Sequence, residues 1–390
     1  MLFSSEQSLR VLHLVKTSTG AGWALRQMRE LVKLGYEVHV ALPPGGPLIP
    51  TYEGAGIIVH PFEADFPART PWELPRKLRQ LRNLVDHVQP AIIHSHFVGT
   101  TLLMRLALGK EHPVPRVFQV PGPLHLEHLF FRKVETLTAG PRDYWIGSCR
   151  WTCECYRRAG VPTDRVFLSY YGTDIEVSTS FARLGKLRQE LGLSSKTPLV
   201  GMVAYMYPPK WYLGQRRGIK GHEDLIDAIT VCLNNGVDLR SVFIGGAWNN
   251  ARWYENRVRA YASPKWKDRI IFLGTRNDVM ALYPDLDVAV HPSHSENVGG
   301  AGESLLMGVP TIATDVGGVP DVVKDGQTGW LVPPRRPRQL AEKIIGILND
   351  LESAKASALR GRELAKRLFD VRITARQVRD IYQMVLRESR

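Results

Sequence analysis

Short apolar runs alternate with amphipathic segments along most of the chain, and the first of them define a repeating unit. Residues 10–16 form an apolar run that predicts a buried strand. The segment that follows carries an apolar helical face, made of Leu25, Met28, Leu31 and Val32. Gly35 stands where a helix C-cap glycine belongs, and residues 37–43 predict the next strand. This strand–loop–helix–glycine–strand unit is typical of a parallel α/β sheet.

A second unit of the same kind begins near residue 198. Residues 198–207 predict a strand, and residues 221–236 predict a helix that again ends at a glycine. From about residue 338 to the end, the pattern is helical. We therefore expect two doubly wound halves that divide between residues 175 and 190. In such sheets the ligand lies beyond the carboxyl ends of the strands, so the expected site is the cleft between the halves.

Length and composition agree with a two-domain globular protein. The chain has 390 residues, of which 44% are hydrophobic and 23% charged. No apolar run reaches the roughly 18 residues of a membrane span. The N-terminal segment enters the first predicted strand without a cleavage-site pattern, so we expect no signal peptide. The net charge of +13 favours an anionic partner: a nucleotide, a lipid surface or a nucleic acid.

The cysteines do not define a metal site. They are Cys149, Cys153, Cys155 and Cys232. Three are clustered, but the fourth is distant and the spacing matches no convincing set of metal ligands. We expect reduced thiols, with a metal site as the alternative.

Candidate chemistry concentrates in residues 294–310, HSENVGGAGESLLMGVP, where two glutamates flank a glycine-rich loop at a predicted helix start. Free backbone N–H groups at a helix start favour anions, and glycines allow a ligand to approach closely. A carboxylate repels phosphate, but it accepts hydrogen bonds from vicinal hydroxyls. A nucleotide sugar satisfies both features. The plainer alternative is that Glu303 interacts with the helix dipole and Glu296 is a solvated loop residue.

The stretch from residue 294 to the glycine pair Gly317–Gly318 resembles the C-terminal domain of retaining GT-B glycosyltransferases of the family-4 type. Those enzymes carry two glutamates separated by seven residues, then a Gly-x-Pro strand and a Gly-Gly turn. The resemblance places Glu303 on the donor ribose. The strict first position is Ser295, so Glu296 is one residue out, and we assign it to the donor sugar's hydroxyls. Four backbone amides are expected against the sugar and diphosphate, those of Asn297, Val298, Gly299 and Gly300.

Further donor contacts follow from the same resemblance. Lys220, in "GIKGHEDLIDA", is expected to place its ammonium on the diphosphate, where a cation stabilises the leaving group. Tyr205 stands where the family has an arginine. Three cations of the following loop could supply the missing charge, and the sequence does not choose among them: Lys210, Arg216 and Arg217. Arg217 is the one we assign to the donor, and the alternative is that the loop is a solvated insertion. The turn at Arg276 and Asn277 is expected beside the nucleobase. Alternatively, Asn277 or Asp278 caps a helix there.

The first half supplies weaker signals. Residues 18–24, STGAGWA, resemble the family's glycine loop, which places Gly22 near the donor phosphate and acceptor. Residues 91–97, AIIHSHF, resemble a strand end on which His96 faces the acceptor; the alternative is that His94 and His96 are packing histidines. In residues 169–175, SYYGTDI, the family's Gly-x-Asp pattern makes Asp174 a residue that either positions groups or shapes a turn.

The family's catalytic histidine has no direct counterpart. Pro121 takes its expected position, and three candidates lie just beyond: His125, Glu127 and His128. We select His125 and count it, with Lys220 and Glu296, among the catalytic residues.

The resemblance implies an α/β, GT-B fold of two facing Rossmann-like domains with a cleft between them. The expected divisions are residues 1–178 on the acceptor side, 179–372 for the nucleotide sugar, and a helix over 373–390 that returns to the first domain. The implied activity is a retaining hexosyl transfer of EC 2.4 type, from a UDP- or GDP-sugar to a glycan or lipid-linked acceptor in polysaccharide biosynthesis. The donor's own phosphate helps to deprotonate the acceptor, and neither a cofactor nor a metal is expected.

Location and acceptor are open at this stage. We expect a cytoplasmic protein, or a peripheral one at the inner face of the cell membrane. Residues 71–88 carry one apolar face, made of Leu74, Leu78, Leu81 and Val85, opposite several arginines. That helix either packs into the core or contacts an anionic bilayer.

Other classes of function are weighed against this one. A dinucleotide-dependent oxidoreductase or epimerase needs three glycines after the first strand, but Leu25 stands at the third place after Gly20 and Gly22. Nucleic-acid binding is not expected, because basic residues are scattered and no binding module is present. A degenerate, non-catalytic GT-B protein is the stronger rival, since Tyr205, Pro121 and the shortened glutamate spacing depart from the pattern.

Overall fold

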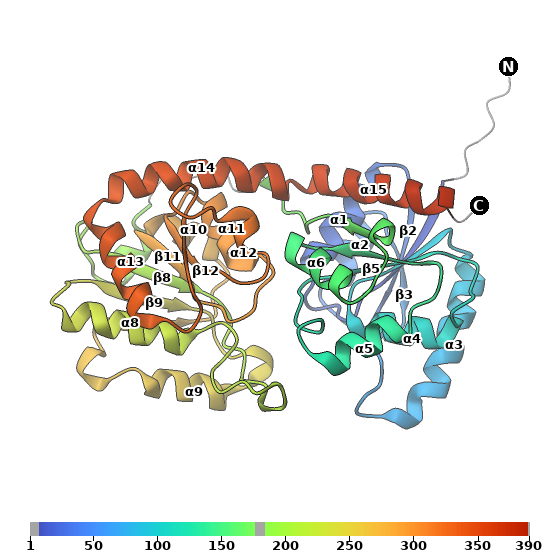
Figure 1. Ribbon diagram of the computed structural model, residues 1–390, viewed down its shortest axis with the longest axis horizontal. Helices are drawn as coiled ribbons and strands as arrows, with labels where there is room; N and C mark the ends of the chain where they lie inside the picture. Colours follow the sequence, from blue (N-terminus) through green and yellow to red (C-terminus); the bar gives the residue numbers. More distant parts are fainter. Residues whose placement is uncertain (1–7, 176–183, 389–390) are drawn as a thin grey trace, which may run out of the picture. The chain divides into compact units, whose positions relative to one another are not determined.

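The computed structural model describes residues 8–175 and 184–388, and the chain forms two compact units. One unit comprises Met1–Asp174 with Leu368–Arg390, and the other comprises Ile175–Arg367 (Figure 1). The predicted domain boundary between residues 178 and 179 lies outside the described residues. Each unit has its own sheet and its own hydrophobic core.

The first unit is built on a parallel sheet with the strand order β3-β2-β1-β4-β5-β6-β7. The strands are β1 Arg10–Leu14, β2 Glu37–Leu42, β3 Ile58–Pro61, β4 Ile92–Ser95, β5 Arg116–Val120, β6 Asp143–Gly147 and β7 Val166–Leu168. The helices are α1 Gly22–Lys33, α2 Ile49–Gly54, α3 Leu74–Val88, α4 Val98–Leu108, α5 Leu129–Leu137, α6 Arg150–Arg158 and α15 Val371–Glu388. Two 3₁₀ turns are η1 Pro71–Glu73 and η2 Thr163–Arg165.

The two faces of this sheet bury different helices because successive strand side chains point to opposite sides. On one face, Val11 and Ile92 pack with residues of α1 and α15. On the other face, Leu12 and Ile93 pack with residues of α3 and α4. The apolar face predicted over residues 71–88 belongs to this second core, where Leu81 and Val85 are buried and Leu74 and Leu78 pack against it. The core interpretation of that face is therefore confirmed.

The second unit repeats the architecture with the strand order β10-β9-β8-β11-β12-β13. The strands are β8 Leu199–Val203, β9 Arg240–Ile244, β10 Ile270–Gly274, β11 Val288–His291, β12 Thr311–Thr314 and β13 Trp330–Val332. The helices are α7 Lys186–Glu190, α8 His222–Asn234, α9 Arg252–Tyr261, α10 Val279–Leu282, α11 Gly299–Leu306, α12 Val319–Val322, α13 Pro337–Asn349 and α14 Leu351–Phe369. The 3₁₀ turns whose bounds lie within residues 184–388 are η4 Trp211–Leu213, η5 Trp248–Asn250, η6 Pro264–Trp266 and η7 Tyr283–Asp285.

All recorded strand pairs in both sheets are parallel, as the repeating sequence unit predicts. Each strand order reverses direction beside the first strand of its unit: β1 and β4 pair in the first, β8 and β11 in the second. Such switch points are where open α/β sheets place ligands. Over the described residues, none of the helices has the length and apolar character needed to cross a membrane.

Candidate functional site

The loop between β11 and α11 is held in place by close backbone contacts with the glycine turn that follows β12. A Cβ on Gly317 would lie 1.8 Å from the carbonyl oxygen of Glu296, and Gly317 has φ +53°, so this position requires glycine. Gly318 donates a backbone hydrogen bond to the same carbonyl at 3.3 Å. A Cβ on Gly300 would meet the His291 ring at 2.7 Å. These glycine contacts thus fix the backbone position of Glu296.

Glu296 forms an ion pair with Lys220 that joins the β11–α11 loop to the segment before α8. The Glu296 carboxylate also accepts hydrogen bonds from the Ser293 hydroxyl and the Asn297 backbone N–H, each at 3.1 Å. Burial alone would raise the pKa of Glu296, but the Lys220 charge and these hydrogen bonds outweigh burial and lower the pKa. Two residues that the sequence assigned separately are therefore one charged pair.

A pocket of about 390 Å³ in the second unit collects many of the predicted donor contacts. Glu303, Lys220, Tyr205 and Gly300 all line it. The Tyr283 hydroxyl lies 3.5 Å from a Glu303 carboxylate oxygen, while the rest of Glu303 is exposed. The first turn of α11 presents backbone N–H groups that have no partner within the helix, as an anion requires.

The Asn297 and Val298 segment is less open than predicted. The Asn297 backbone N–H is already bonded to Glu296, and the Val298 side chain is buried. The side-chain oxygen of Asn297 is buried without a hydrogen-bond partner. A buried oxygen of this kind is able to accept a hydrogen bond from a ligand or water.

An aromatic cluster borders the pocket where the resembled family has an arginine. The Tyr205 ring contacts Trp248 at 5.5 Å between centroids, and Tyr207 stacks on Trp248 at 4.7 Å. The Lys220 ammonium lies 5.8 Å from the centre of the Tyr207 ring, which favours the cation. Trp248 was missed by sequence reasoning, because only the fold brings η5 beside the end of β8.

Arg276 is the second cation of the pocket. Within the part of the chain that the structure describes, Lys220 and Arg276 are the lysine and arginine residues that line it. Arg276 hydrogen bonds to Asp278 at 2.9 Å and to Glu190 at 2.7 Å, and these contacts raise its pKa. Asn277 is exposed between them. Helix α10 begins at Val279 with Asp278 at its N-cap position, as the alternative predicted, but the Asp278 side chain makes no capping hydrogen bond.

Arg217 lies in a separate hollow. It pairs with Asp224 and, at 2.8 Å, with Asp227, and it donates to the Tyr261 hydroxyl. With Arg216, it lines a hollow of about 490 Å³, which does not include Lys220 or Glu303. Arg217 is thus neutralised by two carboxylates, and the structure does not bring it together with the other predicted donor residues.

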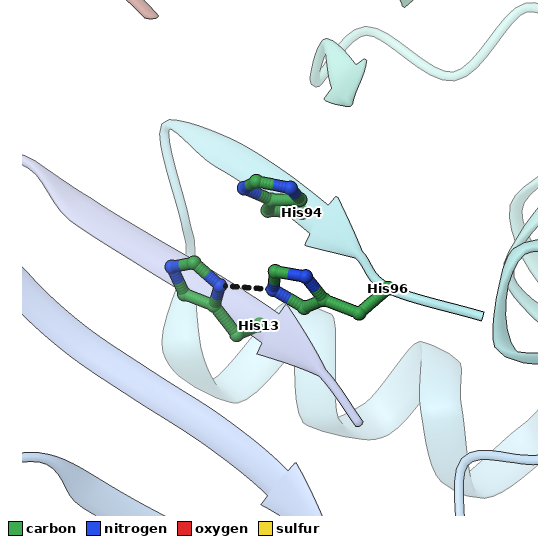
Figure 2. A group of neighbouring side chains, drawn as sticks. All are labelled: His13, His94 and His96. Atoms are coloured by element: carbon green, nitrogen blue, oxygen red, sulfur yellow. Dashed lines mark hydrogen bonds between the residues drawn. The ribbon is translucent and has the colours of Figure 1, made fainter. Parts of the chain in front are cut away.

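In the first unit, three histidines form a buried stack, with His13 on β1 and His94 and His96 at the end of β4 (Figure 2). The ring planes of the three pairs differ by 10°, 20° and 30°. This is the one group of possible metal ligands found among the described residues, and it excludes the cysteines. Nearly parallel rings direct their in-plane lone pairs along parallel planes rather than to one point, so the geometry favours a hydrogen-bonded stack over a metal site.

The hydrogen bonds determine the tautomers of two of these rings. The Tyr171 hydroxyl donates to the Gln119 carbonyl at 2.8 Å, so it must accept from His96 Nδ1, 3.0 Å away. In a neutral His96, Nε2 then accepts from His13 Nδ1 at 2.8 Å. Burial lowers the pKa of His13 to about 3 and that of His96 well below its ordinary value, which keeps both neutral. His96 is fully buried in this stack, and its acceptor-side role stays a prediction.

The other predicted residues of the first unit lie apart. His125 is buried against Phe118 and Tyr156, and burial lowers its pKa. Gly22 begins α1, and Asp174 pairs with Arg29. A ring placed as His125 is does not face solvent, so its catalytic role stays a prediction.

Sequence reasoning also passed over an Asp-x-Asp pair, Asp285 and Asp287. Asp285 accepts the backbone N–H groups of Gly185 and Leu187 at 2.8 and 2.7 Å. Asp287 pairs with Arg188 at 2.6 Å and accepts the Leu199 N–H. Both carboxylates therefore tie α7 to the sheet.

Comparisons with known proteins agree with this architecture. Residues 23–177 match the family described as Glycosyltransferase Family 4, and residues 211–350 match Glycosyl transferases group 1. The capsular polysaccharide biosynthesis glycosyltransferase CapM of Staphylococcus aureus is 26% identical over 181 residues, 46% of each chain. The D-inositol 3-phosphate glycosyltransferase of Corynebacterium glutamicum (strain R) is 30% identical over 229 residues, 56% of this chain and 51% of that one. The matches thus span about half the length of these relatives.

Solved structures extend the likeness to the whole fold. The structure of Anabaena Alr3699/HepE in complex with UDP superposes with a TM-score of 0.79 at 22% identity, covering 97% of this chain and 100% of that chain. Two parallel α/β units of this kind constitute the GT-B fold. With both units matched, the chain belongs to the family-4 glycosyltransferases of GT-B fold.

Proposed function

We propose that this protein is a hexosyltransferase that moves a sugar from a nucleotide-sugar donor to a glycan or lipid-linked acceptor, with retention and without a metal. The observation that carries the proposal is the pocket in which Lys220, Glu303 and the start of α11 converge. The cation and the helix-start amides match the diphosphate of a nucleotide sugar, and the Glu303 carboxylate matches its ribose hydroxyls.

The Lys220–Glu296 pair suggests how the donor is engaged. A diphosphate carries more negative charge than one carboxylate, so Lys220 exchanges Glu296 for the phosphates when the donor binds. Glu296 is then free to accept hydrogen bonds from the donor sugar's hydroxyls, and Lys220 stabilises the charge that develops on the leaving nucleoside diphosphate. The protein contributes position and electrostatics, while the donor's phosphate assists the acceptor hydroxyl.

UDP-sugars are the first donors to test, because HepE has been solved with UDP and with UDP-glucose. The name of CapM, a capsular polysaccharide biosynthesis glycosyltransferase, supports a role in polysaccharide assembly.

The test is nucleotide release from UDP-, GDP-, ADP- and dTDP-sugars, with and without a chelator. We expect slow hydrolysis of one donor, unaffected by the chelator, and a loss of at least about 100-fold in Lys220→Ala, because one transition-state charge contact is removed. Glu303→Ala is expected to raise the donor KM. Lys355→Ala, a surface cation on α14, is the control and keeps full activity.

The proposal fails if no donor is hydrolysed and neither UDP nor GDP raises the melting temperature. Stabilisation by a nucleotide without any turnover supports instead the degenerate, sugar-binding alternative.

A further inference from the structure

Helix α5, Leu129–Leu137, has its polarity reversed. Its buried residue is a carboxylate, Glu135, which is 3% exposed. The Trp145 indole donates to this carboxylate at 2.8 Å, and Arg105 of α4 pairs with it at 3.3 Å. The helix is therefore anchored to the first unit by buried polar contacts.

The outward face of α5 is apolar. Leu129, Phe130 and Leu137 are 64%, 63% and 69% exposed. Leu129 and Leu137 are eight residues apart, so they lie on one stripe of the helix with Lys133 between them. A water-exposed helix normally has the opposite arrangement, and large exposed apolar side chains grouped on one helix face mark an interaction site.

Cations surround this apolar ridge. Lys133 is exposed within it, and Arg132 is beside it. The neighbouring helices continue the layer, since α4 bonds to α5 through Arg105 and to α3 through Arg82, which donates to the Ala107 carbonyl (Figure 1). On α4, Leu106 is 42% exposed, and α3 turns three arginines outward: Arg76, Arg79 and Arg82. Trp72, 74% exposed, stands just before α3.

We propose that the outer face of α5, together with the arginine face of α3, docks on an anionic lipid surface. Exposed apolar side chains on the outer face of one helix suit shallow insertion between lipid headgroups. Exposed lysine and arginine side chains beside it match anionic headgroups, and the whole chain carries a net charge of +13. Trp72 has the amphipathic ring that membrane interfaces favour.

The docking surface deepens the proposed function, on which its biological use rests, because α5 directly follows the segment that holds His125. A lipid-linked acceptor would then meet the first unit where the protein touches the membrane.

Sedimentation with vesicles tests the surface with the full chain. Wild type is expected to bind vesicles containing about one third phosphatidylglycerol more tightly than pure phosphatidylcholine, and high salt weakens the binding. Phe130→Ser/Leu137→Ser is expected to lower the partition coefficient at least about tenfold, since two large apolar groups no longer insert. The matched control is Trp253→Ser/Leu359→Ser, which removes two similarly exposed apolar groups from the second unit and leaves binding unchanged.

Donor hydrolysis, measured on the same proteins, separates the two proposals. Unchanged hydrolysis together with lost vesicle binding supports the docking surface. No binding of wild type to anionic vesicles overturns it, as does equal binding by the α5 variant. Concentration-dependent dimerisation that the α5 variant abolishes also overturns it, in favour of self-association.

Discussion

At the scale of single residues, the main feature of the site is the ion pair between Lys220 and Glu296. The Glu296 carboxylate also accepts hydrogen bonds from the Ser293 hydroxyl and the Asn297 backbone N–H. Under the proposed function, donor binding breaks this pair before new contacts form. Pairing the two charges lowers the cost of burying either group alone.

This pairing predicts a pH-dependent stability. Because the pKa of Glu296 is lowered in the folded protein, its contribution is fully present above the ordinary value of about 4.5 and is lost as the pH falls through the lower folded value. Glu296→Gln is expected to cost about 1–3 kcal/mol at pH 7. The difference from wild type is expected to persist at pH 5 and to narrow below pH 4.5 in thermal melts. Exposed Glu352→Gln is the control, with little effect at any pH.

Between elements, the histidine stack joins parts of the first unit that are far apart in sequence. His13 and His94 lie on paired strands, His94 bonds to Tyr382 of α15 at 2.5 Å, and His96 reaches β5 through Tyr171. These rings must be neutral to stay buried. Any condition that charges them therefore loosens β1, β4 and α15 together.

Acidification is such a condition, because it protonates the three histidine rings. For a histidine whose folded pKa is lowered, the unfolded chain binds more protons, so stability is full above about pH 6.5 and falls as the pH drops toward the folded value. Each ring contributes a slope of at most about 1.4 kcal/mol per pH unit. We expect the urea midpoint to fall steeply as the pH drops from 6.5 to 5, and His94→Gln to flatten that slope. Exposed His87→Gln should leave it unchanged; an equal effect of both variants would contradict the role of burial.

Local sequence predicts the elements well but not their partners. The apolar runs and Gly35 correctly predicted units of a parallel α/β sheet. The spacing to the glycine pair after β12 singled out Glu303, which lines the same pocket as Lys220. The position of Arg217 depends on Asp227 and Tyr261, which pattern alone does not bring near it. For His125, the sequence shows a histidine in the right segment, whereas its burial depends on Tyr156 from another element. The reversed polarity of α5 was equally hidden, because the groups that bury Glu135 come from α4 and β6.

At the scale of the whole molecule, the chain crosses between the units twice. Residues 175–367 form the second unit, and residues 368–390 belong again to the first. Four residues of α15 join the core on the first sheet: Val378, Ile381, Tyr382 and Val385. The C-terminal helix is therefore a structural part of the unit that begins the chain.

Truncation tests this arrangement. Removing residues 371–390 is expected to make the first unit sensitive to protease and to leave a resistant fragment from the second, because the second unit's core does not use α15. Limited proteolysis with mass spectrometry identifies the fragments. Arg387→Ala, at the exposed end of α15, is the control. Equal resistance of both units in the truncated chain would contradict the assignment.

The same crossing has a consequence for synthesis. Domains generally fold as they leave the ribosome, the first one first. Here the first unit lacks the α15 part of its core until residues 371–388 have been translated. The sheet face that α15 covers therefore stays uncovered while the second unit is translated and folds. The first unit thus begins to form before the second unit and is completed after it, so chains that terminate before α15 would lose the first unit and keep the pocket of the second.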